Sequence, residues 1–211
     1  MTRNLTPEQY GALSQRIRAA EAQTSGEIYC VVAGTSDSYI YPALTLAGIA
    51  SVLVNLATAL VLDRSWMEIS LTTLALCQFA AFAATALILW LWPGLRIHFV
   101  PHRLRYRRAH DNAVKQFLAH NIHLTTQRTG VLIFVSLAER YAEIVADAGI
   151  DGKVPQADWD GIVGGIIEHA AADRLADGLG EAIDRAGALL STHFPGGLDN
   201  PNELEDHVVE I

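Results

Sequence analysis

The 211-residue sequence has little cysteine and little charge. Its two cysteines, Cys30 and Cys77, exclude a disulfide scaffold and a four-thiolate zinc site. Charged residues make up 18% of the chain, whereas soluble domains usually have about 25%. Hydrophobic residues make up 51%. This composition excludes intrinsic disorder, and it indicates that more of the chain is buried than a small globular core needs.

Signatures of common catalytic sites are also absent. The sequence contains no GxSxG elbow, no Walker A pattern, no GxGxxG, no HExxH and no EF-hand loop. Neither cysteine lies in a polar segment with a histidine nearby, as a catalytic thiolate would. No single catalytic chemistry therefore follows from motifs.

The charges that are present are unevenly distributed along the chain. Residues 1–95 carry a net charge of −2, residues 96–128 carry +6, and residues 129–211 carry −12. We call residues 96–128 the basic band. The total of −8 argues against a protein that binds nucleic acid.

Two long uncharged runs precede the basic band. Residues 43–62 and 69–92 hold 20 and 24 residues without a charge, and each run is long enough for a helix to cross the ~30 Å hydrocarbon core of a bilayer. Only DRSWME joins them, so the two helices must form a tight hairpin. A buried hairpin in a soluble fold would need a far larger domain around it. The sequence therefore predicts two transmembrane helices.

The orientation of this hairpin follows from the positive-inside rule. Five arginines follow the second run, whereas the connecting loop has Arg64 against Asp63 and Glu68. Both termini are therefore expected in the cytoplasm of a cell-membrane protein. The arginines that we expect to contact anionic lipid headgroups are Arg103, Arg105, Arg107 and Arg108.

The rest of the chain alternates between helix and strand patterns. Residues 27–33, 130–138 and 141–148 are predicted strands, and the last two form an antiparallel hairpin. Neither soluble piece can bury its strand alone, because about three strands and a helical layer are needed. Residues 1–40 and 95–200 should therefore fold together as one α/β domain, an α/β/α sandwich with a small mixed sheet, interrupted by the transmembrane hairpin. Residues 201–211 are expected to be an acidic tail.

Four aspartates gather in the sequence around the loop that follows the last predicted strand. They are Asp147, Asp151, Asp158 and Asp160. Carboxylates that converge between a strand and a helix can hold a hard cation, Ca²⁺ or Mg²⁺. The alternative is that Asp158 is the N-cap of the next helix and that the others are solvated.

Several patterns outside the uncharged runs resemble the TPM domain family. They are GEIYCVV at 26–32, TGVLIFVSLAERYAEIVADAGID at 129–151, the helix from Asp158, and GLGEAIDRAGALLSTHFP at 178–195. The resemblance covers about 150 residues and implies a membrane-associated α/β/α domain. Acid phosphatase activity and divalent-metal binding, attributed to some family members, point to the aspartate loop. This chain differs from the common layout, because its spans interrupt the domain.

Two functions remain open at this level. The first, which the missing catalytic motifs favour, is a non-catalytic interaction or assembly module, anchored in the lipid bilayer and presenting an acidic surface to a protein partner. The second is a divalent-metal-dependent phosphatase-like hydrolase, in which the four aspartates bind the cation.

Overall fold

The computed structural model describes residues 5–65, 70–197, 203–204 and 208–211, with the side chain of Asp151 also outside the description. The chain forms two compact units. The first comprises residues 1–36 and 106–211, and the second comprises residues 37–105.

The first unit is a mixed α/β domain around a four-stranded sheet of order β3-β2-β1-β4. β1 pairs in parallel with β2 and with β4, and β2 pairs antiparallel with β3. The sheet is therefore small and mixed, as predicted. Its strands are β1 (Glu27–Ala33), β2 (Gly130–Ser136), β3 (Tyr141–Ala146) and β4 (Val208–Glu210).

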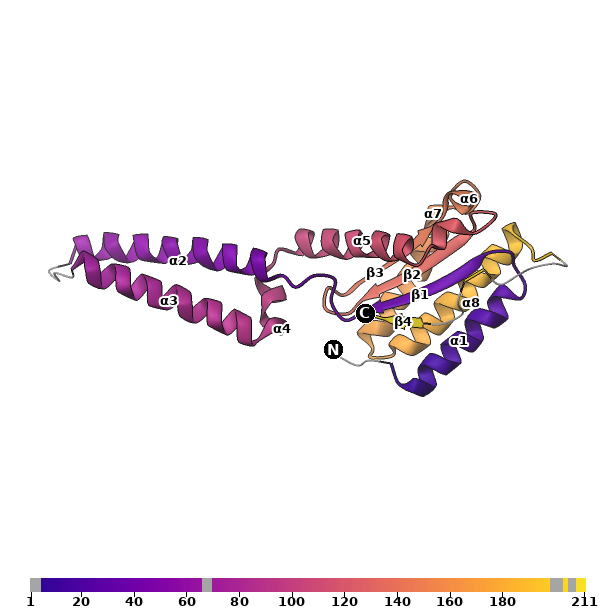
Figure 1. Cartoon of the computed structure of the whole chain (residues 1–211), viewed down its shortest axis with the longest axis horizontal. Coiled ribbons are helices and arrows are strands. Elements are labelled where there is room, and N and C mark those ends of the chain that lie inside the picture. Colours follow the sequence, from indigo (N-terminus) through magenta and orange to yellow (C-terminus); the bar gives the residue numbers. More distant parts are fainter. Residues whose placement is uncertain (1–4, 66–69, 198–202, 205–207) are drawn as a thin grey trace. The chain divides into compact units, whose positions relative to one another are not determined.

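Helices cover both faces of this sheet (Figure 1). Ile28, Cys30 and Val32 of β1 pack into one core with α1, α7 and α8, whereas alternate residues of the same strand face α5. Because β1 is buried on both faces, it is a continuous apolar run. The helices and short turns of this unit are α1 (Pro7–Glu21), α5 (His102–Ala119, which begins in the second unit), η2 (Ile122–Leu124), α6 (Ala148–Asp151), α7 (Gln156–Ala171) and α8 (Leu175–His193).

Helix α1 begins as its sequence predicts. The Thr6 side chain accepts a hydrogen bond from the backbone N–H of Gln9, and the Gln9 side chain accepts one from the N–H of Thr6, which completes a capping box. Pro7 takes the first turn, where its missing N–H costs nothing.

Strand β4 lies in the segment that the sequence predicts to be an acidic tail. Cys30 of β1 is in register with Val208, and the Tyr10 hydroxyl of α1 donates a hydrogen bond to Glu210. Burial, reinforced by Glu210, raises the pKa of Tyr10, so its hydroxyl keeps the proton that it donates. The C-terminal residues thus belong to the sheet.

The second unit is a helical hairpin with a short irregular base. Gln78 of α3 donates a hydrogen bond to Ser51 of α2, so a polar contact joins the two helices. After α3, the Arg96 side chain donates hydrogen bonds to the carbonyl oxygens of Leu89 and Trp90. These carbonyls belong to the last turn of the helix, where backbone N–H donors are lacking. Its elements are α2 (Ile40–Asp63), α3 (Leu71–Leu91), α4 (Pro93–Arg96) and η1 (Ile97–Phe99).

Candidate functional site

The predicted aspartate loop lies at the amino edge of the parallel pair β1 and β2. Strand β3 runs antiparallel to β2, so its last residues return to the start of β2. There the Asp147 backbone N–H donates to the carbonyl of Gly130 at 2.9 Å. The Asp147 side chain is only 4% exposed, and its Oδ1 caps α6 by accepting from the N–H of Ala148 at 2.6 Å. The role of Asp147 that the structure shows is therefore that of N-cap of α6.

The second carboxylate oxygen of Asp147, Oδ2, is the atom of the predicted metal site that is best placed to bind a cation. Oδ2 is buried and has no hydrogen-bond partner among the described residues. The closest charged group is the guanidinium of Arg128, whose Nε lies 3.5 Å away. A cation at this oxygen would compete with that guanidinium.

The other aspartates of the loop do not gather around Asp147. Helix α7 starts at Gln156 with Pro155 as its N-cap, so the alternative that Asp158 is the N-cap is wrong. Asp158 is exposed in the first turn of α7, where its negative charge interacts favourably with the positive end of the helix dipole. Asp160, also exposed, accepts a hydrogen bond from the Gln156 side chain at 3.0 Å. The side chain of Asp151 lies outside the described residues.

A hard cation such as Ca²⁺ needs six to eight oxygen ligands, and the described side chains do not assemble them. Within the part of the chain that is described, no three His, Cys, Asp or Glu side chains lie close enough to share a metal ion. One buried carboxylate beside an arginine does not fit a cation by itself. The four-aspartate metal site thus stays a prediction, and no reaction step is derived from it.

A buried polar cluster that the sequence does not predict occupies the opposite, carboxyl edge of β1 and β2. Its centre is Glu139, which is 2% exposed in the turn between β2 and β3. Glu139 Oε1 accepts from the Ser36 N–H at 3.0 Å and from the Thr35 hydroxyl at 3.3 Å, and Oε2 accepts from the Ser136 hydroxyl. The hydroxyl oxygens of Ser36 and Ser136 lie 2.8 Å apart.

This cluster holds the chain where it leaves the domain. Thr35 and Ser36 follow β1 directly, and α2 begins four residues later at Ile40. The carboxylate of Glu139 therefore fixes Thr35 and Ser36, the first residues of the long segment that separates β1 from β2 in the chain. Alternation of apolar and polar residues cannot predict this role, because a turn glutamate is ordinarily solvated.

An apolar pocket of about 260 Å³ lies beside the cluster. It is formed by the end of β2, the β2–β3 turn and the facing parts of α7 and α8, and its walls include Ser136, Tyr141, Ile166 and Leu175. Arg140 and Asp173 supply its charged groups. Carboxyl edges of parallel strands are common ligand sites in α/β folds, so this edge is the better-shaped candidate of the two.

These features together define an α/β sandwich domain that a helical hairpin interrupts. The family model of the TPM domain matches residues 94–189. The chain therefore contains a TPM domain. The match begins after the hairpin, and α1 and β1 lie outside it although β1 is a central strand of the sheet.

The fold is similar to that of a solved structure. The NMR structure of the BA42 protein from the psychrophilic bacterium Bizionia argentinensis is similar with a TM-score of 0.61 and 21% sequence identity, over 100% of this chain and 97% of that one. No curated protein matches the chain.

Proposed function

We propose that this protein is anchored in the cell membrane by α2 and α3 and presents its TPM domain in the cytoplasm as a non-catalytic interaction or assembly module. The observation that carries the proposal is the surface of the two helices. Both are long and apolar enough to cross a membrane by length and composition. Almost none of their apolar windows is buried, which separates them from core helices of a soluble fold.

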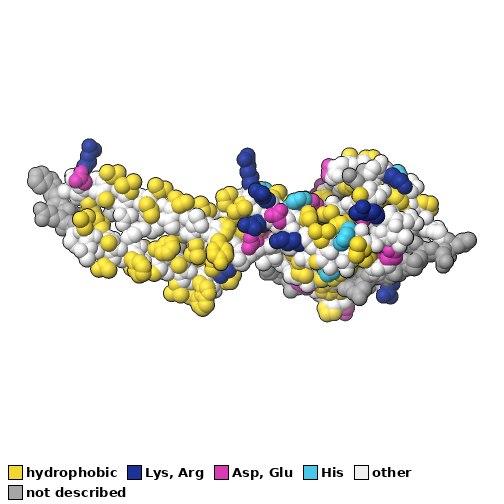
Figure 2. Space-filling view, turned by 45° about the horizontal axis from the view of Figure 1, so that its top comes forward, with side chains coloured by type: hydrophobic (Ala, Val, Ile, Leu, Met, Phe, Trp, Pro, Cys, Tyr) yellow, Lys and Arg dark blue, Asp and Glu magenta, His cyan; other side chains and the backbone are white. Residues whose placement is uncertain are grey.

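The exposed side chains of these helices are large and hydrophobic (Figure 2). Val54 is 65% exposed, Leu76 65% and Phe79 73%. Burial of apolar surface contributes about 25 cal/mol per Å², so a hairpin covered with such side chains is far more stable in hydrocarbon than in water. The backbone of each helix satisfies its own hydrogen bonds, as a lipid environment requires.

The orientation rests on charge. Arginines follow the second helix in the basic band, whereas Asp63 and Arg64 at the described end of the loop cancel each other. By the positive-inside rule, the basic band and both termini face the cytoplasm. The domain then presents the exposed acids of α7, α8 and the turn between them to a protein partner. These acids are Asp158, Asp160, Glu168, Asp173, Asp177, Glu181 and Asp184.

Cysteine accessibility tests anchoring and orientation together. In a Cys77→Ser background, Ser65→Cys places a thiol beyond α2 and Ala188→Cys places one on the exposed side of α8. We expect a membrane-impermeant maleimide to label Ser65→Cys in intact cells, and Ala188→Cys only after lysis. The reverse pattern contradicts the orientation, and extraction of the protein by alkaline carbonate contradicts the anchoring.

A divalent-metal-dependent phosphatase-like hydrolase is the second candidate, and the buried Oδ2 of Asp147 favours it. Binding to the folded state alone raises the unfolding midpoint. Detergent-solubilised protein in EDTA is therefore compared with protein in Ca²⁺ or Mg²⁺. A saturable rise that Asp147→Asn or Asp158→Ala abolishes supports this candidate. No rise at millimolar metal rejects it.

A further inference from the structure

The exposed hydrophobic side chains of the TPM domain concentrate in one segment. Among the described residues of the first unit, six large hydrophobic side chains are exposed, and four of them fall within residues 106–124. This is the basic band, the one part of the chain with a strong positive charge. The four are Tyr106 at 37%, Val114 at 36%, Leu118 at 52% and Leu124 at 66%.

Helix α5 places basic and apolar residues on the same solvent-facing stripe. Its buried residues, Ala109, Ala113 and Phe117, are spaced by four and mark the side that faces the sheet. At 3.6 residues per turn, Arg103, Arg107, Val114 and Leu118 share a stripe about 60° wide on another side of the helix.

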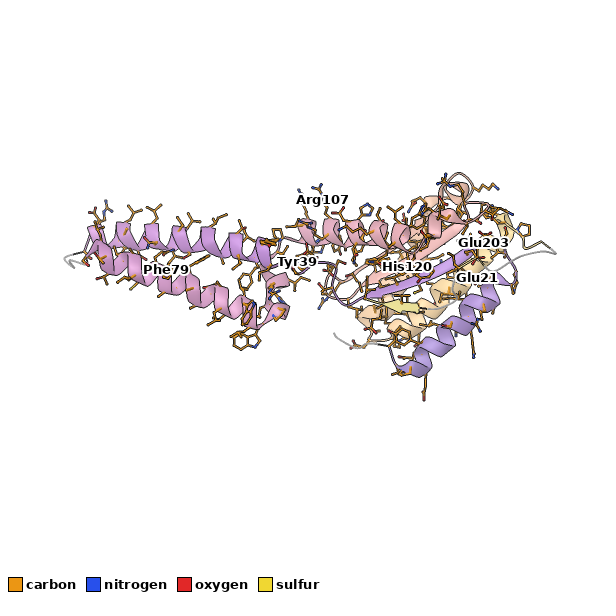
Figure 3. All side chains as sticks on the ribbon, viewed as in Figure 1. Glu21, Tyr39, Phe79, Arg107, His120 and Glu203 are labelled. Atoms are coloured by element: carbon orange, nitrogen blue, oxygen red, sulfur yellow. The ribbon has the colours of Figure 1, made fainter. Side chains whose placement is uncertain are left out.

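The four basic-band arginines of α5 are therefore not equivalent. Figure 3 shows Arg107 pointing away from the sheet. Arg105 and Arg108 fall off the stripe that contains Val114 and Leu118.

We propose that this stripe of α5 docks on an anionic lipid surface, with its arginines at the phosphates and Val114 and Leu118 at the headgroup–acyl boundary. The inference rests on the proposed membrane anchoring. An interfacial membrane helix buries apolar side chains at the headgroup–acyl boundary and is attracted to anionic lipids by its basic residues. The stripe of α5 presents both kinds of side chain to one surface, because long arginine side chains can extend to the phosphates while Val114 and Leu118 lie deeper.

Charge complementarity selects lipid as the occupant. Residues 129–211 carry a net charge of −12, so an anionic surface repels most of the domain and attracts the basic band. The attraction and the repulsion together turn this one face toward the membrane. The hairpin tether makes docking an intramolecular step with a high effective concentration.

The test places a fluorophore on the stripe of the full-length protein. Leu118→Cys in a Cys77→Ser background is labelled with the environment-sensitive dye NBD. Burial raises the pKa of the Cys30 thiol to about 12, so this cysteine stays protonated and unlabelled. The labelled protein is reconstituted in vesicles of phosphatidylcholine alone or mixed with phosphatidylglycerol, each with and without nitroxide-labelled lipid.

In the anionic vesicles we expect blue-shifted NBD emission that nitroxide lipids quench. We expect neither effect in phosphatidylcholine alone or at high salt, which screens the attraction. Arg107→Glu should lower the ratio of docked to undocked domain about thirtyfold. The reversal changes the local charge by two units, and each unit near the surface contributes about 1 kcal/mol. Arg140→Glu, an equal charge reversal on an exposed turn, should leave the signal unchanged.

Two further reporters separate the inference from the anchoring. NBD on the natural Cys77 of α3 should be quenched in both vesicle types, and NBD on Ala188→Cys of α8 in neither. Quenching at Cys77 without quenching at Leu118→Cys overturns the docking and leaves the anchoring intact. Quenching at Leu118→Cys without quenching at Cys77 overturns the anchoring and supports a peripheral protein that docks through α5. Equal quenching at Leu118→Cys in neutral and anionic vesicles overturns the anionic requirement.

Discussion

Replacing Glu139 with alanine should destabilise the TPM domain strongly, although Glu139 lies in the four-residue turn between β2 and β3. The change removes the acceptor of three hydrogen bonds, from the Ser36 N–H and from the Thr35 and Ser136 hydroxyls. A hydrogen bond to a charged group contributes about 1.5–3 kcal/mol, and a buried donor that loses its acceptor costs about 1–3 kcal/mol. Ser136 keeps the Ser36 hydroxyl as a partner, and Thr35 gains access to water, so the costs do not add fully.

We therefore expect Glu139→Ala to lower the free energy of unfolding by about 3–5 kcal/mol, a large share of the 5–15 kcal/mol of a typical domain. The assay is urea unfolding of the full-length protein in detergent micelles, followed by the fluorescence of Trp159, which is buried in α7. In a thermal scan the same loss lowers the midpoint by about 10 °C.

Glu139→Gln is the matched control, because its amide oxygen still accepts from the Ser36 N–H and the Ser136 hydroxyl can turn to accept from the amide nitrogen. It should cost less than half as much as Glu139→Ala. The reasoning is refuted if Glu139→Ala changes stability by less than about 0.5 kcal/mol, the range of ordinary surface substitutions. It is also refuted if the glutamine variant is as damaged as the alanine variant.

Three further predictions test the fold. Thr6→Ala removes the capping box of α1 and should cost about 1 kcal/mol in the same unfolding assay, and no loss would contradict the cap. Gly187→Ala places a methyl group 2.6 Å from an α1 methyl group and should destabilise the domain, whereas Gly164→Ala meets nothing within 4 Å and should stabilise α7 by up to about 1 kcal/mol. In a Cys77→Ser, Ala188→Cys variant at pH 8, maleimide should label the thiol on the exposed side of α8 and spare Cys30 until denaturant is added, because burial keeps the Cys30 thiol protonated.

The sheet core and the helix starts could be predicted where the sequence has a strong local signal. Strands β1 and β2 are seven-residue apolar runs, and α1 has both halves of its capping box in the sequence. Strand β4 could not be predicted, since its two valines and one glutamate are too short to show alternation. It is a strand because β1 has a free edge beside it.

The candidate sites were harder to predict from the sequence than the strands, because tertiary packing decides which polar side chains are buried. Asp147 and Asp158 are near each other in sequence, yet the structure makes the first a buried cap and the second an exposed first-turn residue. Glu139 lies beside Arg140 in a turn, where a charged side chain is ordinarily solvated, yet it is buried and accepts a hydrogen bond from the Ser36 N–H just after β1. No local pattern distinguishes these cases.

The position of β1 also orders events during synthesis. This strand emerges from the ribosome before the two apolar helices, while Gly130 and Val208, the first residues to pair with it from β2 and β4, emerge long afterwards. A strand buried on both faces must therefore wait, without its neighbours, until the hairpin has been made and has found its environment. The domain can therefore assemble only after the hairpin has been synthesised, and a chain whose helices fail to insert leaves the apolar strand β1 exposed to pairing with other chains.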